Sequence, residues 1–183
     1  MATALILMAP GCEELEAVTV IDLLRRAGID VVTAGLDDKP VRASRGTVLL
    51  PDTTLDAALG REYDMIVLPG GQPGADNLDR DPRIYPLLRS MAADGKFTAA
   101  ICAAPKVLAH AGLLHGRRAT AFPGTLNGVE DEDIQLLSDA VVTDGTVITS
   151  RGPGTAMDFA LELIEVLENR TTRDRVEAAL QRP

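Results

Sequence analysis

Short, uniformly apolar runs alternate with longer amphipathic segments along the chain. The run 4–9 (ALILMA) has the pattern of a buried strand, and segment 13–28 repeats apolar residues at helical spacing before Gly28. Segment 81–95 predicts a helix with Asp81 as N-cap and Pro82 at its first position. Further strands are predicted at 29–35, within 42–52, at 63–71 and at 96–101; further helices at 105–114, 155–169 and 173–181; and a hairpin at 139–150 around Asp144-Gly145.

This alternation predicts an α/β fold, a doubly wound and mostly parallel sheet with helices on both faces and a β-hairpin. The length of 183 residues suits one domain spanning 1–183. Ligands of such sheets bind beyond the carboxyl ends of the strands. Three segments follow strands at that edge, APGCEELE, LPGGQPG and ICAAP, and together they predict a site.

Cys102 lies at the predicted junction between a strand and a helix, in the segment FTAAICAAP. A side chain on such a tight turn projects above the sheet, and the N-terminus of the following helix lowers a thiol pKa. These features favour a nucleophile. The alternative is a small buried side chain, since free cysteines are among the most buried residues.

A nucleophilic cysteine needs a proton acceptor, and the two histidines, His110 and His115, follow Cys102 in positions typical of solvated surface residues. A carboxylate is therefore the expected partner. Glu13, Glu14 and Glu16 crowd the first turn of the helix after the first strand. The pattern selects none of them, because acids there also complement the helix dipole.

Glycine and arginine residues supply further candidates. Gly70 and Gly71 follow a buried strand and offer backbone N–H groups to a developing oxyanion, although Pro-Gly-Gly also forms a simple turn. Arg45 and Arg151 each precede a glycine after β-rich runs. They suit an anionic substrate, a neighbouring subunit or plain solvent exposure.

Charge and cysteine content narrow the function classes. The net charge is −9, with 27 acidic and 18 basic residues and no basic cluster, which argues against nucleic-acid or membrane partners. The N-terminal run lacks a basic flank, and two cysteines without a framework spacing make a cytoplasmic location the expectation. No metal-ligand motif is present. Cys12 is expected to be an exposed loop thiol, with a redox pair to Cys102 as the alternative.

Five segments of the chain form one set of motifs in register: APGCEELEAVTVIDLLRRAGI, ASRGTVLLPD, YDMIVLPGG, AAICAAP and VITSRGPGTAMDFAL. With these segments the chain resembles the ThiJ/PfpI superfamily, in the branch of the Parkinsonism-associated protein deglycase and the YajL-like proteins. The resemblance covers nearly the whole chain and implies a flavodoxin-like fold, a homodimer and no cofactor.

The resemblance also implies roles for individual residues. Cys102 matches the family nucleophile, and Glu16 matches the carboxyl that hydrogen-bonds its sulfur. The backbone donors around the thiol match Gly70, Gly71 and Ala103, and the residues closing the site and its dimer surroundings match Arg45 and Arg151.

The same resemblance marks one departure. Many relatives have a histidine before the proline of TAFPG, where this chain, like YajL-like members, has Phe122. Ala103 occupies the position of the histidine in peptidase-like members, which argues against a protease. The implied function is a cofactor-independent glyoxalase or deglycase acting on methylglyoxal, glyoxal or early glycation adducts. The alternative is an oxidative-stress sensor or chaperone that uses oxidation of the same cysteine.

Overall fold

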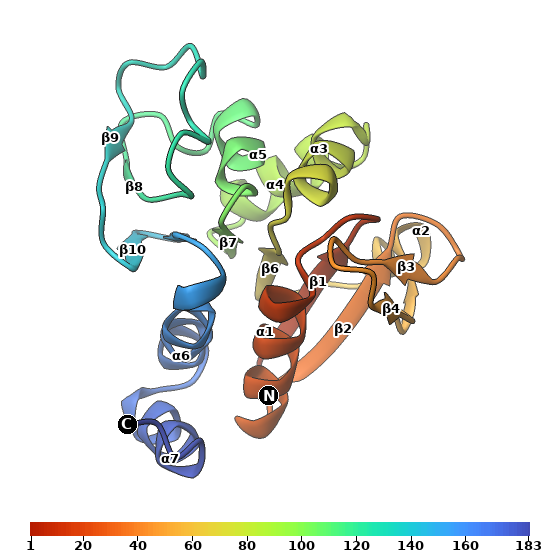
Figure 1. Cartoon of the computed structure of the whole chain (residues 1–183), viewed down its shortest axis with the longest axis vertical. Helices are drawn as coiled ribbons and strands as arrows, with labels where there is room; N and C mark the ends of the chain where they lie inside the picture. Colours follow the sequence, from red (N-terminus) through yellow and green to blue (C-terminus); the bar gives the residue numbers. More distant parts are fainter.

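A seven-stranded sheet forms the centre of the protein, whose computed structural model describes residues 1–183, with the strand order β10-β11-β7-β6-β1-β2-β5 (Figure 1). All neighbouring strands are parallel except the β10–β11 hairpin. The strands are β1 (Thr3–Met8), β2 (Asp30–Gly35), β5 (Thr53–Thr54), β6 (Met65–Leu68), β7 (Phe97–Ile101), β10 (Val141–Asp144) and β11 (Val147–Ser150).

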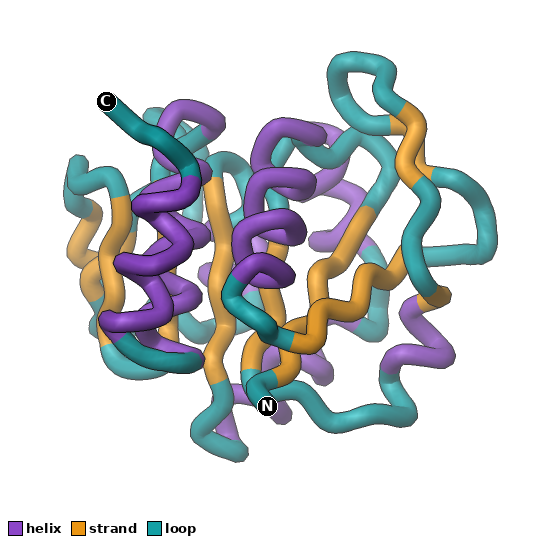
Figure 2. Tube along the Cα trace, turned by 90° about the horizontal axis from the view of Figure 1, so that it is seen from below, coloured by secondary structure: helices purple, strands orange, loops and turns teal.

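Helices cover both faces of the sheet (Figure 2). Alternate residues of β1 explain why its sequence is apolar throughout: Ile6 enters the hydrophobic core on one face, and Leu5 and Leu7 enter the core on the other. The first face carries α1 (Glu14–Arg26), α6 (Ala156–Leu167) and α7 (Arg170–Ala179); the second carries α2 (Leu55–Ala58), α3 (Gln72–Arg80), α4 (Ile84–Ala93) and α5 (Pro105–His110).

Two small sheets and a 3₁₀ turn complete the fold. The strands β3 (Val41–Arg42) and β4 (Val48–Leu49) form an antiparallel pair, and β8 (Arg118–Ala119) and β9 (Gln135–Leu136) form a parallel pair. The 3₁₀ turn η1 (Pro153–Thr155) leads into α6.

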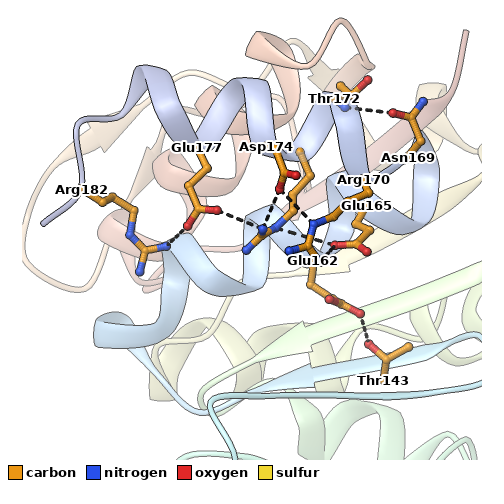
Figure 3. A network of polar contacts seen from close by, with 10 residues as sticks. Thr143, Glu162, Glu165, Asn169, Arg170, Thr172, Asp174, Glu177 and Arg182 are labelled. Atoms are coloured by element: carbon orange, nitrogen blue, oxygen red, sulfur yellow. Dashed lines mark hydrogen bonds and ion pairs between the residues drawn. The ribbon is translucent and has the colours of Figure 1, made fainter.

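The C-terminal helix α7 is attached to α6 by polar contacts near the surface (Figure 3). The Asn169 side chain caps α7 by accepting the Thr172 N–H at 2.9 Å. The Arg170 guanidinium lies 3.5 Å from Glu165 of α6. The Glu162 carboxylate accepts the Thr143 hydroxyl at 2.7 Å and ties α6 to β10. No helix of the protein is both long and apolar enough to cross a membrane.

The predicted α/β fold and its main strands and helices are confirmed, whereas the start of the helix predicted at 81–95 was placed too early. Asp81 directly follows α3, and its carboxylate accepts the Arg83 N–H at 3.0 Å and pairs with the Arg83 guanidinium. The helix therefore begins at Ile84, because Asp81 forms a local turn instead of an N-cap. The pattern missed α2, α3, β5, β8 and β9, which are short or weakly apolar.

Candidate active site

The loops after β1, β6 and β7 meet at one edge of the sheet, because these strands are parallel neighbours. The Glu13 N–H donates to the Gly70 carbonyl at 2.9 Å, which joins the first two loops. Gly71 completes this close approach: a Cβ there would lie 2.5 Å from the Gly11 carbonyl oxygen, and its φ of 83° favours glycine. The loops after β1 and β6, which are far apart in sequence, thus lie against each other at this edge of the sheet.

Cys102 occupies a strained turn between β7 and α5. Its φ of 64° is left-handed, which is uncommon for a residue with a side chain. Hydrogen bonds hold it on both sides: its N–H donates to Ser150 and its carbonyl accepts the Phe122 N–H, both at 2.9 Å. The half-buried side chain therefore projects from the sheet edge, as the sequence predicted.

Glu16 lies beneath this turn and is fully buried. Its Oε2 accepts the Gly70 N–H at 2.8 Å, whereas its Oε1 has no hydrogen-bond partner. Burial raises the pKa of Glu16 to about 7, against the lowering effects of the Gly70 N–H and the neighbouring Cys102 thiol. A carboxyl with this pKa takes up and releases protons near neutral pH.

Gly70 lies close to both the Cys102 thiol and the Glu16 carboxyl and leaves no room for a side chain of its own. A Cβ at this position would lie 2.6 Å from the Cys102 Cβ and 2.7 Å from Glu16 Oε2. The two side chains therefore surround the same small volume, which only glycine leaves open. Because the Gly70 N–H is engaged with Glu16, it does not serve as the free oxyanion donor that the sequence predicted.

The thiol itself titrates differently from the sequence expectation. Burial, followed by the Glu16 carboxylate, raises the pKa of Cys102 to about 12, and the N–H groups of Gly71 and Ala103 oppose this shift. The net lowering of the thiol pKa expected from the following helix is not found, because burial and the nearby Glu16 carboxylate outweigh the N–H groups of the turn. Cys102 and Glu16 thus act as a coupled pair, in which the thiolate forms most easily when the acid holds a proton.

A hollow of about 380 Å³ opens above the thiol. One wall is polar and includes Ser44, Arg45 and Gln72, and the other is apolar and includes Phe122 and Pro153. The structure therefore brings Arg45 to the site, with its side chain 81 % exposed. Sequence reasoning missed several other lining residues: Ser44, Gln72, Pro73, Thr125 and Pro153. Gln72 and Pro73 begin the unpredicted helix α3, and Thr125 lies in an irregular loop.

Glu14 performs a different task from Glu16. Its carboxylate accepts the backbone N–H groups of Arg45 at 3.1 Å and of Thr47 at 3.3 Å, and the Ser44 hydroxyl at 3.2 Å. Slight burial acts in the opposite direction, but these backbone N–H groups lower the pKa of Glu14 to about 2. Glu14 thereby holds the loop that carries Arg45 and Ser44 into the polar wall.

The remaining candidates lie outside this hollow. The Arg151 guanidinium donates to the Ser138 carbonyl at 2.9 Å and lines two neighbouring hollows. His110 pairs with Asp79 on the surface, in agreement with the sequence expectation for the histidines. His115 also lies at the surface, and its ring nitrogens face two loop carboxylates, Asp131 at 3.2 Å and Asp133 at 3.7 Å.

Cys12 is a buried thiol, so its expected exposure was wrong. The loop after β1 folds under α3: a Cβ on Gly74 would lie 2.6 Å from the Cys12 Cα. Burial raises the pKa of Cys12 to about 11. Its side chain lies in the hydrophobic core on the face of α1 and α6, in a cluster that includes Val41 and Ala43, so its burial depends on packing between segments distant in sequence.

Comparisons with known proteins agree with this architecture. Residues 2–166 match the DJ-1/PfpI family. The chain is 42 % identical to protein dj-1beta of Drosophila melanogaster, covering 92 % of this chain and 90 % of the relative. It is 38 % identical to the glutathione-independent glyoxalase DJR-1.2 of Caenorhabditis elegans, covering 91 % and 89 % of the two chains.

Solved structures extend the agreement to three dimensions. The crystal structure of Drosophila melanogaster DJ-1beta superposes with a TM-score of 0.93 at 41 % identity, covering 98 % of this chain and 97 % of that one. The structure of Toxoplasma gondii DJ-1, oxidized, gives a TM-score of 0.93 at 39 % identity and covers 98 % of each chain. Both the sequence and the fold therefore lead to one conclusion: the chain belongs to the DJ-1/PfpI family.

Proposed function

We propose that the protein is a cofactor-independent glyoxalase that converts α-oxoaldehydes such as methylglyoxal and glyoxal to 2-hydroxy acids. The observation that carries this proposal is the pair formed by Cys102 and Glu16, a strained, half-exposed thiol beside a buried acid with a pKa of about 7. The Caenorhabditis elegans relative named as a glutathione-independent glyoxalase supports the same activity.

The first step joins the thiol to the aldehyde. The Cys102 sulfur bonds to the aldehyde carbon, its proton passes to the Glu16 carboxylate, and the carbonyl π electrons move to the oxygen. The N–H groups of Gly71 and Ala103, which face the sulfur, lie close to the developing oxyanion and stabilise it. Protonation of that oxygen by Glu16 gives a hemithioacetal and restores the carboxylate.

The second stage moves a hydrogen between adjacent carbons. Glu16 removes the proton from the former aldehyde carbon, and the ketone carbon is protonated through an enediol, so that the first carbon is oxidised and the second reduced. The product is a thioester of the 2-hydroxy acid on Cys102. Water then cleaves this thioester, which regenerates the thiol and releases lactate from methylglyoxal or glycolate from glyoxal.

The same groups support a finer proposal, the reversal of early glycation adducts on protein side chains. The hollow above Cys102 is open to solvent at Arg45, whose side chain is 81 % exposed, so an adduct on a flexible side chain has access. The rate of adduct loss, measured with an excess of an aldehyde scavenger, distinguishes direct attack on the adduct from removal of the free aldehyde. Direct attack leaves the rate enzyme-dependent under these conditions, whereas scavenging alone makes it independent of the enzyme.

The primary test follows lactate formation from methylglyoxal by the reduced protein, beside Cys102→Ser and Glu16→Gln. Cys12→Ser is the matched control, since it removes the other thiol, which is buried away from the hollow. We expect turnover in the wild type and in the Cys12 variant, and its loss in both site variants. Turnover by Cys102→Ser at the wild-type rate contradicts the mechanism.

An oxidation sensor is the second candidate function, because Glu16 Oε1 has no hydrogen-bond partner beside the thiol. Two equivalents of hydrogen peroxide convert a thiol to a sulfinic acid and two waters, and a protonated Glu16 donates to a sulfinate oxygen. Mass spectrometry after mild peroxide treatment tests this function. Selective addition of two oxygens at Cys102 supports it, and equal oxidation of Cys12 and Cys102 argues against it.

We further propose that the protein forms a homodimer through the outer side of α1. Leu15 and Val18 of α1 are 51 % and 45 % exposed, and Val48 of the nearby β3–β4 hairpin is 55 % exposed. Glu14 joins the two elements, so these side chains belong to one surface. Light scattering of the wild type and of Val18→Asp measures this: a dimer that the substitution converts to a monomer supports the proposal, and a wild-type monomer overturns it.

A further inference from the structure

The exposed aromatic side chain of the molecule lies beside the reactive thiol. The chain has three phenylalanines, two tyrosines and no tryptophan, and Phe122 is the aromatic residue among its exposed large apolar side chains, at 50 % exposure. The Phe159 ring, in contrast, is fully buried. An aromatic ring left exposed at the edge of a hollow offers a contact surface for an apolar ligand.

Backbone hydrogen bonds fix the position of Phe122 beside the turn that carries the thiol. Its N–H donates to the Cys102 carbonyl at 2.9 Å. Its carbonyl accepts the Thr125 N–H at 3.0 Å. The ring also lies over Gly152, where a Cβ would come within 3.4 Å of the Phe122 Cδ2.

Phe122 borders more than one hollow. Phe122 lines the hollow above Cys102 and also a second hollow of about 330 Å³. Leucine side chains contribute much of the lining of this second hollow: Leu126, Leu136 and Leu137. The Phe122 residue therefore borders both the hollow above the thiol and a second hollow whose lining is largely apolar.

We infer that Phe122 is a specificity-determining residue that makes the Cys102 site prefer α-oxoaldehydes with an aromatic or bulky apolar substituent. This inference rests on the proposed glyoxalase function. The aldehyde carbon bonds to the sulfur, and its oxygen faces the N–H groups of Gly71 and Ala103. The substituent on the ketone carbon then lies against the Phe122 ring, which lines the same hollow as Ser44 and Arg45.

The test compares glyoxal, methylglyoxal, cyclohexylglyoxal and phenylglyoxal with the wild type, Phe122→Leu and Phe122→Ala. Since stacking contributes about 0.5–1.5 kcal/mol, we expect Phe122→Ala to lower kcat/KM for phenylglyoxal about twofold to thirteenfold, mainly through KM. Glyoxal has no substituent, so its kcat/KM should fall less than that for phenylglyoxal. Phe122→Leu keeps apolar bulk and retains activity toward cyclohexylglyoxal more fully than toward phenylglyoxal. Equal losses for glyoxal and phenylglyoxal in Phe122→Ala overturn the inference.

A binding measurement separates this inference from the proposed function. Mandelate and lactate are the products expected from phenylglyoxal and methylglyoxal, and both should protect Cys102 from alkylation by iodoacetamide. We expect stronger protection by mandelate in the wild type, and an equal effect of the two acids in Phe122→Ala. If no aldehyde is turned over, the proposed function fails, whereas equal protection in the wild type overturns the aromatic preference itself.

Discussion

Glu14 and Glu16 lie two residues apart in the first turn of α1, yet their surroundings give them opposite properties. Glu14 faces outward and accepts N–H groups of the 44–47 loop, and its pKa falls to about 2. Glu16 points into the sheet edge beside Cys102, and burial raises its pKa to about 7. Glu14 is therefore a permanent anion that holds a loop, whereas Glu16 takes up and releases a proton near neutral pH.

Substitution of Glu16, the buried acid, should have the largest effect on activity. Replacing Glu16 with glutamine keeps its size but removes the proton acceptor, so kcat/KM for methylglyoxal should fall about 100- to 10,000-fold. In the wild type, kcat/KM should rise with pH through about 7, as Glu16 ionises. Steady-state kinetics of the wild type and Glu16→Gln between about pH 5 and 9 measure both effects. A wild-type profile that is flat through neutrality contradicts the role of Glu16 as the base.

The stability of the protein should depend on pH through Glu16, in the direction set by the raised pKa of this carboxyl. Below the ordinary value of 4.5 the carboxyl is protonated in both states; between 4.5 and about 7 the unfolded chain loses the proton while the folded protein keeps it. The free energy of unfolding should therefore fall by about 3 kcal/mol across this window as pH rises. Glu16→Gln should remove this fall, and the exposed Glu132→Gln should retain it. Denaturant titrations at several pH values measure the difference, and parallel curves for wild type and Glu16→Gln contradict the shift.

The separation of the thiol from the acid should be sensitive to one methyl group. Gly70→Ala places a Cβ within 2.7 Å of Cys102, Glu16 and the Ile101 carbonyl, so the loop or β7 must move. We expect a loss of about 1–3 kcal/mol in stability together with loss of turnover. Gly60→Ala is the matched control, because its added Cβ would meet only one carbonyl at an ordinary 3.6 Å. Thermal unfolding compares the two, and equal stabilities argue against the close approach.

Substitution of Glu14, the acid that holds the 44–47 loop, should have the smallest effect on activity and stability. Glu14→Gln weakens the hydrogen bonds to Arg45 and Thr47 without touching the thiol, so we expect a loss of about 1 kcal/mol or less. The KM for methylglyoxal should rise a few fold with kcat unchanged, since Ser44 and Arg45 line the hollow. Because the folded pKa is lowered, the stabilising effect is present above the ordinary pKa of 4.5 and is lost as pH falls toward about 2. A kcat loss comparable to that of Glu16→Gln removes the distinction between the two acids.

Local pattern alone predicted much of the framework and the position of the thiol. The apolar runs 4–9, 63–71 and 96–101 gave β1, β6 and β7, whose parallel pairing follows from the helices between them. The junction at Cys102 followed because a strand pattern stops there and Pro105 begins a helix. Helix α3 was missed, since its nine residues contain few apolar positions and its buried face includes Gly74 and Ala75.

Periodicity could not choose among the three glutamates, and only the resemblance to the family favoured Glu16. The tertiary structure distinguishes them physically. Gly70 is 54 residues from Glu16 and the 44–47 loop is 30 to 33 residues from Glu14, so neither environment is visible in a local window. Long-range packing also buried Cys12 and engaged the Gly70 N–H, against expectation. The sequence by itself therefore determined the main strands, most of the helices and the turn that presents the thiol, because those depend on neighbours in the chain. Only the folded structure decided which acid is desolvated and which donors remain free, because burial and hydrogen bonding depend on neighbours in space.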